Sequence, residues 1–324
     1  MSTLTAVTAR FPELAYRLRV PSFRRSTEPV LGTRLTLRVD AADEQMAEVT
    51  FAAVLAEADR LEAALSAYRP ESAFAAWRRG ELVDPGPDVV AVLALAAHWH
   101  EKTSGAFSPR LGALMRRWAR AEREQRVPSA EEMADLASHA SRLPFVVDDS
   151  RVFAIGDCRD VDVHGVAKGW VIDRMVGAAL RTAGVAGVVV DVGGDLRHAA
   201  RDVASRATVA IEDPFALADN APPLTVVTIA NRAVATSGGG RRGWNVAGRW
   251  YGHLLDPRSG WPLATPRSAT VVASTAADAD ALASAAAVVG EQISTIEPAC
   301  AALVVDEQGE VWRSDSWANS VDEL

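Results

Sequence analysis

The chain has 324 residues, of which 49% are hydrophobic and 23% are charged, an ordinary balance for a folded globular protein. Its formal net charge of −8 argues against nucleic acid as the main partner. The two cysteines form neither a metal-type pair nor a disulfide framework. We find no signal-peptide pattern and no apolar run long enough to span a membrane, so we expect a cytoplasmic protein without membrane insertion.

The first half of the chain has mainly helical patterns. We expect residues 1–27 to form a flexible polar arm and residues 28–324 to form one domain. Alternating apolar residues over 29–39 predict a strand, and Asp88 is expected to cap a long helix. Helical composition continues through the segments 43–67, 74–79, 88–100, 109–121 and 120–142. This helical part ends at about residue 144.

The second half, about 145–324, is rich in strand patterns. The continuous apolar run over 187–192 predicts a central strand, which ends in a Gly-Gly-Asp turn. A second glycine-rich turn is expected over 234–240. Strands are expected over 145–155 (a hairpin), 207–211, 224–230, 250–255, 269–273 and 302–313 (a closing hairpin), with a helix over 277–289. We therefore predict an α/β (α+β) fold with a mixed β-sheet and flanking helices.

The stretch 162–173 combines a carboxylate, a glycine turn and a lysine, and it opens into an amphipathic helix. Free N–H groups at a helix start form an anion site, and Lys168 in the first turn would add a full positive charge. This pattern favours phosphate or pyrophosphate binding. An ordinary loop-to-helix turn with a solvated lysine remains the alternative.

Asp280 and Ser284 lie four residues apart and therefore share one face of the predicted helix 277–289. A carboxylate and a hydroxyl at this spacing, with a backbone carbonyl and waters, can hold magnesium. The alternative is a plain exposed helix face. Asp278 cannot share that face, and we interpret it as a carboxylate at the helix start.

Together these patterns resemble the FAD:protein FMN transferase (ApbE-like flavin transferase) family over about residues 29–316. Each matching segment is a weak signal by itself, but eight in the family's order make a strong one. The matching segments are 31–33, 66–72, 103–107, 162–173, 192–195, 236–238, 253–260 and 278–284. The resemblance implies an ApbE-like (T-fold-like) architecture, with FAD in a cleft between the helical and sheet-rich parts.

The resemblance also implies an activity. Family members bind FAD with Mg²⁺ at its pyrophosphate, transfer FMN to a threonine hydroxyl of an acceptor flavoprotein, and release AMP. By position, the implied metal ligands are the Gly165 carbonyl, Asp280 and Ser284. The residues implied in cofactor binding are Leu31, Gly105, Ala106, Phe107, Asp162, Lys168, Thr236, Ser237, Gly238 and Leu255.

The implied catalytic residues are His253, Asp256 and Lys168. Lys168 would neutralise phosphate charge, and His253 would act as base for the threonine hydroxyl, with Asp256 as second choice. Alternatively, His253 is a strand histidine bonded to backbone, and Arg258 pairs with Asp256 instead of contacting phosphate. His98 and His100 are interpreted as structural or solvated.

Three residues depart from the family pattern. His164 replaces a common glycine beside the metal carbonyl, Ser108 replaces an aspartate, and Arg78 replaces an asparagine. The change at His164 bears on the loop beside the metal carbonyl, and the changes at Ser108 and Arg78 bear on the flavin-side pocket and on the balance between transfer and hydrolysis.

Two alternative functions share the same residues. One is a Mg²⁺-dependent FAD pyrophosphatase that gives FMN and AMP, and the other is a non-catalytic FAD-binding protein. A Rossmann dehydrogenase is rejected, because no Gly-x-Gly-x-x-Gly follows the first predicted strand.

Overall fold

The computed structural model describes residues 20–202, 204–216, 218, 220–238, 240 and 242–323. Within this part of the chain, eight strands form one large sheet in the spatial order β1-β2-β5-β6-β9-β12-β13-β14. The strands are β1 (Ser22–Val30), β2 (Thr33–Ala41), β5 (Val185–Val192), β6 (Asp195–Ala200), β9 (Ala233–Gly238), β12 (Ser268–Ala273), β13 (Ala301–Val305) and β14 (Val311–Arg313).

Smaller strand groups accompany the large sheet in the described residues. A three-stranded sheet has the order β15-β8-β7, and two hairpins pair β3 with β4 and β10 with β11. Their bounds are β3 (Phe145–Asp148), β4 (Arg151–Ala154), β7 (Ala207–Ile211), β8 (Thr225–Ile229), β10 (Gly243–Val246), β11 (Arg249–Gly252) and β15 (Asp322–Glu323).

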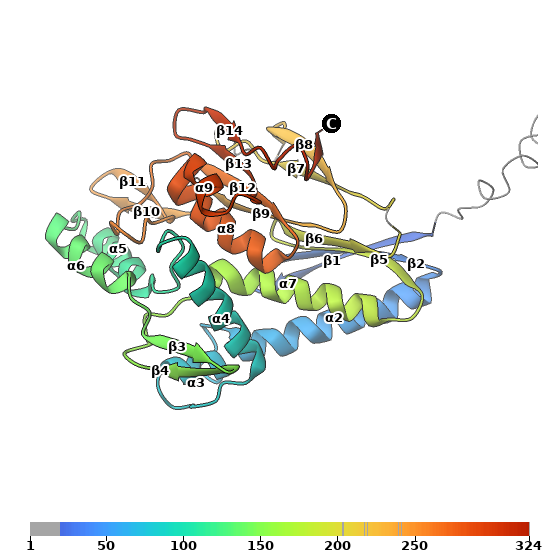
Figure 1. Ribbon diagram of the computed structural model, residues 1–324, viewed down its shortest axis with the longest axis horizontal. Coiled ribbons are helices and arrows are strands. Elements are labelled where there is room, and N and C mark those ends of the chain that lie inside the picture. Colours follow the sequence, from blue (N-terminus) through green and yellow to red (C-terminus); the bar gives the residue numbers. More distant parts are fainter. Residues whose placement is uncertain are drawn as a thin grey trace, which may run out of the picture.

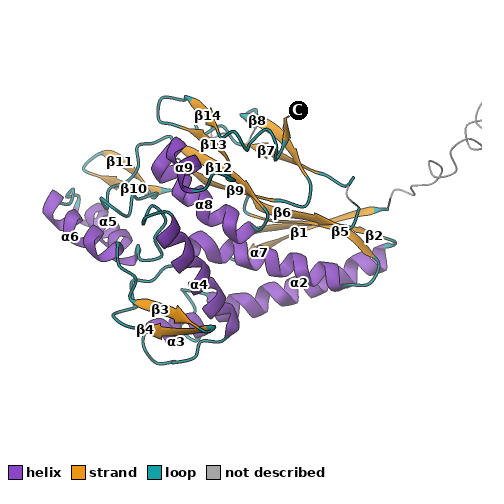
Figure 2. Ribbon diagram, viewed as in Figure 1, coloured by secondary structure: helices purple, strands orange, loops and turns teal. Residues whose placement is uncertain are grey.

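The helices lie mainly on one face of the large sheet, as Figures 1 and 2 show. Their bounds are α2 (Glu44–Leu65), α3 (Ala73–Arg78), α4 (Pro87–Lys102), α5 (Gly112–Glu124), α6 (Ala130–Ala140), α7 (His164–Arg181), α8 (Ala276–Val289) and α9 (Ile293–Ile296), with a 3₁₀ turn at Gly290–Gln292. In the described part of the chain, no helix is long and apolar enough to cross a membrane.

The α+β class with flanking helices is confirmed, but the expected mixed sheet is wrong. Every strand pairing among the described residues is antiparallel. The strands β5 and β6 are joined by the two-residue turn Gly193–Gly194, which permits only antiparallel pairing. Both glycines have positive φ, 61° and 97°, which the turn requires.

The first strand was predicted in the wrong place. Instead of one strand over 29–39, β1 and β2 form a hairpin whose turn is Leu31-Gly32, with φ of 49° and 75°. Residues 22–27, assigned to the arm, belong to β1 because they pair with β2. The rest of the predicted arm, residues 1–19, lies outside the described residues.

Two more predictions need correction. The expected glycine-rich turn over 234–240 is largely strand β9, which is held between β6 and β12. Small residues such as Ala233 and Ala235 pack under α8 there, so the segment is buried in the sheet instead of forming a turn. The helix α4 is capped at Gly86, not at Asp88, because Pro87 takes the first helical position.

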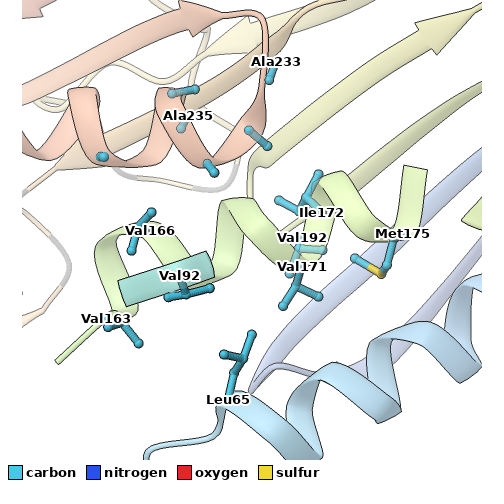
Figure 3. Packing of buried hydrophobic residues seen from close by; sticks show 14 of the residues in the cluster. Leu65, Val92, Val163, Val166, Val171, Ile172, Met175, Val192, Ala233 and Ala235 are labelled. Atoms are coloured by element: carbon cyan, nitrogen blue, oxygen red, sulfur yellow. The ribbon is translucent and has the colours of Figure 1, made fainter. Parts of the chain in front are cut away.

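The main core lies between the helices and the large sheet. The helix α7 contributes Val171, Ile172 and Met175, which are nearly or fully buried. Figure 3 shows these side chains near Leu65 of α2 and Val92 of α4. The small sheet covers the opposite face of the large sheet with a second apolar cluster, so the molecule has three layers.

A third cluster joins α5 and α6 to the β10–β11 hairpin. Trp118 is fully buried there, beside Trp244, Tyr251 and Trp261, and its Nε1–H donates to the Gly260 carbonyl at 3.0 Å. The segment 120–142 is helical, as predicted, and its buried face supports the loop that follows β11.

Candidate active site

The candidate site lies where α7 and α8 cross. A Cβ on Gly169 would lie 2.2 Å from the Ala276 carbonyl oxygen, so the two backbones are in direct contact. The Gly169 N–H donates to Oδ2 of Asp280 at 3.2 Å. Glycine at this crossing brings the first turns of α7 against the first turns of α8, and the two predicted motifs therefore meet.

Asp280 is the central acidic group of the site. Only 6% of its surface is exposed, so the alternative of a plain exposed helix face is excluded. Burial and the nearby charge of Asp195 raise the pKa of Asp280 to about 7, although Lys168 opposes this shift. Two buried carboxylates beside one lysine leave an excess of negative charge, which a bound cation would neutralise.

Further oxygen atoms lie around this carboxylate. A Cβ on Gly165 would be 3.4 Å from Oγ of Ser284 and 3.1 Å from the Phe107 ring. Ser284 Oγ is also 3.2 Å from Ser237 Oγ, on β9. Residues from four separate segments of the chain thus converge, and all four were predicted as metal or cofactor positions.

Lys168 is held beside Asp280 by a buried partner. Its Nζ lies 2.5 Å from Oδ2 of Asp195, while Oδ1 of Asp195 accepts the Thr236 N–H at 3.1 Å. Burial disfavours the charged amine, but Asp195 and Asp280 outweigh it and raise the pKa of Lys168. The solvated-lysine alternative is therefore wrong, because this side chain is a fixed positive charge.

A carboxylate of the same chain lies at the start of α7. Oδ1 of Asp162 accepts the His164 N–H at 2.9 Å and also contacts His164 Nδ1 at 2.5 Å. Burial opposes ionisation of this carboxyl, but His164 and the charge of Arg78 together lower the pKa of Asp162. Asp162 thus satisfies one N–H group of the first turn of α7.

The three departures from the family pattern have visible structural roles. Arg78 Nη1 donates to the Val161 carbonyl at 2.8 Å, which places its charge beside Asp162. Ser108 Oγ donates to the Ala140 carbonyl at 2.8 Å, so it ties the 103–107 loop to α6. The His164 ring points toward Tyr68, with 5.4 Å between ring centroids.

His253 lies just after β11, not inside a strand. Its backbone N–H and its Nδ1 both contact the Arg242 carbonyl, at 3.0 and 3.2 Å. Burial lowers the pKa of His253, so the ring is neutral near pH 7. Because Nδ1–H donates to the carbonyl, Nε2 has a free lone pair that can accept a proton.

Asp256 is engaged elsewhere. Its two oxygens accept from Nε and Nη2 of Arg258, both at 2.9 Å, within the turn that ends at Gly260. Arg258 therefore pairs with Asp256, as the alternative interpretation stated. This ion pair makes Asp256 a weaker candidate base than His253.

The other sequence-predicted positions lie at varied distances from this centre. Ala106 is buried beside Phe107, and Gly105 forms the preceding turn with φ of 78°. Gly238 ends β9 next to Ser268. Leu31 packs at the edge of the main core, and Leu255 belongs to the Trp118 cluster, so the structure brings neither into contact with Asp280. His100 contacts the Phe107 and Ser141 carbonyls, a structural role.

Sequence reasoning gave no role to Asp195, although its Gly-Gly-Asp motif was recognised. The signal was a carboxylate placed directly after a strand-ending glycine pair, where a chain turns back into the sheet. Only the structure shows that this carboxylate faces Lys168.

The residues fit a hard cation such as Mg²⁺. Asp280 supplies a buried carboxylate, Ser284 a hydroxyl and Gly165 a backbone carbonyl, all oxygen donors of the kind that Mg²⁺ prefers. Among the described residues no three His, Cys, Asp or Glu side chains cluster as a metal cage. That composition suits an ion that keeps waters and binds substrate phosphates.

An ion-paired lysine beside oxygen donors that suit a hard cation is an arrangement suited to phosphate groups, and comparison with known proteins identifies the family. The chain belongs to the ApbE family, whose model matches residues 31–303.

Individual relatives agree with this assignment. The FAD:protein FMN transferase of Treponema pallidum is 30% identical over 313 residues, covering 89% of this chain and 83% of that protein. The protein of the same name from Klebsiella pneumoniae is 28% identical, covering 89% and 84%. The ApbE protein of Thermotoga maritima has 26% identity and a TM-score of 0.78, covering 93% of this chain and 99% of that one.

Proposed function

We propose that this protein is an FAD:protein FMN transferase, which cleaves FAD with Mg²⁺ and joins FMN to a threonine hydroxyl of an acceptor flavoprotein. The observation that carries the proposal is the buried cluster of Asp280, Ser284, Lys168 and Asp195 at the α7–α8 crossing. The transferases of Treponema pallidum and Klebsiella pneumoniae match nearly the whole chain, which supports the same activity here.

The reaction replaces the phosphoanhydride bond of FAD by a phosphate ester to threonine. The threonine oxygen forms a bond to the FMN phosphorus, the bond from that phosphorus to the bridging oxygen breaks, and AMP leaves with that oxygen. Such a transfer needs positioning and charge neutralisation more than covalent catalysis. A Mg²⁺ ion, held by Asp280, Ser284 and the Gly165 carbonyl, would supply Lewis-acid stabilisation of the phosphate charge.

The protein's own groups perform the remaining tasks. Lys168, kept charged by Asp195, stabilises negative charge that develops on the leaving AMP. His253 accepts the threonine proton at Nε2, because its Nδ1 is held by the Arg242 carbonyl. On the flavin side, Asp162 with the 103–107 loop orients the ring system.

The proposal is tested by incubating the protein with FAD, Mg²⁺ and a threonine-bearing acceptor peptide, followed by mass analysis. We expect a peptide carrying covalently bound FMN, together with one AMP for each peptide modified. The same peptide with alanine in place of threonine is the control, and it should remain unmodified.

The test also separates the two alternatives. Free FMN and AMP without a peptide adduct would contradict the transferase and identify an FAD pyrophosphatase. Intact FAD after prolonged incubation with Mg²⁺ would instead identify a non-catalytic FAD-binding protein.

A further inference from the structure

The start of α8 is capped by a residue of another helix. Asp173 of α7 accepts the Ala276 N–H through Oδ1 at 2.8 Å and the Ala277 N–H through Oδ2 at 3.0 Å. The next two N–H groups of α8 donate to Thr275, one to Oγ1 and one to the carbonyl. The N–H groups of Ala276, Ala277 and Asp278, which a helix start normally leaves without an intrahelical partner, are therefore all satisfied.

The Asp173 carboxylate suits this position in charge as well as geometry. A negative charge is stabilised at the positive end of a helix dipole. Arg197 of β6 also donates from Nη1 to Oδ1 of Asp173 at 2.6 Å, so the carboxylate joins two helices and the large sheet. Its side chain is only 12% exposed, which makes these bonds well shielded from solvent.

By the metal site we mean the Gly165 carbonyl, Asp280 and Ser284. On α8, Asp280 lies one helical turn after the capped Ala276, and on α7, Asp173 lies about two turns after Gly165. Gly169 and Asp173 are four residues apart, on the same face of α7. Gly169 contacts α8 through its N–H bond to Asp280 and through its close approach to Ala276. Asp173, one turn further along α7, also bonds to α8. The two contacts together set the register between α7 and α8.

We propose that Asp173 is a positioning residue for the reaction: its cap on α8 holds the oxygen donors of the two helices at the separation that a metal ion requires. The metal site is divided between α7 and α8, so a shift of one helix along the other would separate its ligands. Groups that orient metal ligands typically change metal affinity by about 10–100-fold when they are removed. This inference rests on the metal site of the proposed function but not on the transfer chemistry.

The experiment compares Asp173→Asn with Asp88→Asn. Asp88 is a matched control, because its side chain is also 12% exposed and bonds to one arginine, Arg60, at 2.6 Å. Its other donor is Trp170 Nε1 of α7, at 3.2 Å, so it contacts no part of α8. Both variants lose one buried charge, and only Asp173→Asn disturbs the link between the two helices.

Binding of Mn²⁺, a spectroscopic substitute for Mg²⁺, is measured by electron paramagnetic resonance with and without FAD. The Mg²⁺ concentration for half-maximal turnover is measured in parallel. We expect Asp173→Asn to lower the affinity for Mn²⁺ and to raise the Mg²⁺ concentration for half-maximal turnover, each by about tenfold or more. We expect Asp88→Asn to change each of them by less than about threefold. Unfolding by denaturant shows whether the two variants lose comparable stability.

Unchanged Mn²⁺ affinity in Asp173→Asn would overturn the inference, as would equal losses in both variants. An absence of Mn²⁺ binding by the unmodified protein would overturn it too. If the unmodified protein binds Mn²⁺ and Asp173→Asn weakens that binding, the inference stands even where no FMN is transferred. That result would contradict only the proposed function.

Discussion

At the scale of single residues, Asp280 shows how burial makes a carboxylate functional. The pKa of Asp280 is raised to about 7, so its ionised form is unfavourable. The fold nevertheless places this carboxyl beside a second acid, Asp195. Lys168 offsets only part of the negative charge. Such an arrangement is unfavourable for stability alone, and it is typical of a site that binds a cation.

Replacing Asp280 by alanine is therefore expected to abolish Mg²⁺-dependent turnover while leaving some FAD binding. The expected loss is at least about 1000-fold, since charge stabilisation by a bound metal is worth several kcal/mol. Turnover is measured by AMP release, and FAD binding by quenching of flavin fluorescence.

Asp278→Asn is the control for that variant, because Asp278 bonds to Trp99 and Thr275, not to the metal site. It should retain turnover within about threefold. Full activity in Asp280→Ala would show that the metal ligands are assigned wrongly.

At the scale of elements, the α7–α8 crossing depends on one missing side chain. The ideal Cβ of Gly169 would fall 2.2 Å from the Ala276 carbonyl oxygen and 2.6 Å from the Ala277 Cα. Both are backbone atoms, which cannot move aside as a flexible side chain can. The helices approach closely enough to share the proposed metal site because this position has no Cβ.

Gly169→Ala is expected to destabilise the protein by about 2–3 kcal/mol or more, since the helices must separate to admit the methyl group. Gly177→Ala, on the same helix, is the matched control. A Cβ there meets only the flexible Arg181 Nη1 at 3.4 Å, so about 0.5–1 kcal/mol of stabilisation is expected. Denaturant unfolding measures both, and equal effects at the two positions would refute the close-crossing argument.

At the scale of the whole molecule, His198 joins the layers. It is fully buried in β6, its Nδ1 accepts the Asn231 N–H at 3.0 Å, and its Nε2 donates to Ser205 at 3.1 Å. Burial, helped by the positive charges of Arg38 and Arg206, lowers the pKa of His198 to about 4. The folded protein therefore keeps this ring neutral where the unfolded chain, with a pKa near 6.5, takes up a proton.

Stability is thus fully present above pH 6.5 and falls as the pH drops from 6.5 toward 4, because the unfolded state binds more protons in that range. When the pH falls from 7.5 to 5, this residue should lower the free energy of unfolding by about 2 kcal/mol. His198→Asn should remove that part of the pH dependence, because the ring that takes up the proton is gone. The amide oxygen can still accept the Asn231 N–H, so that hydrogen bond is kept. Urea unfolding at both pH values measures it.

His139→Asn is the control, since that histidine is exposed on α6 and should leave the pH dependence unchanged. If His198→Asn and His139→Asn show the same difference between the two pH values, the assignment to His198 is wrong.

The sequence by itself determined most of the helices, the α+β class and the residue types of the site. Helical spacing in α7 and α8 and the order of short motifs are local properties, and they survive without knowledge of the fold. The β1–β2 turn and strand β9 were missed because they are not local properties of the sequence. Whether Leu31-Gly32 turns, or whether 234–238 joins a sheet, depends on strands distant in sequence.

Only the tertiary structure decided which polar groups meet. Lys168 and Asp195 are separated by a helix and a strand, and Asp173 lies about a hundred residues before the helix that it caps. It also showed that Asp162 bonds to the His164 N–H at the start of α7. Burial and long-range contacts set the charge states of the site residues and the register between α7 and α8. Such contacts arise only when the chain packs.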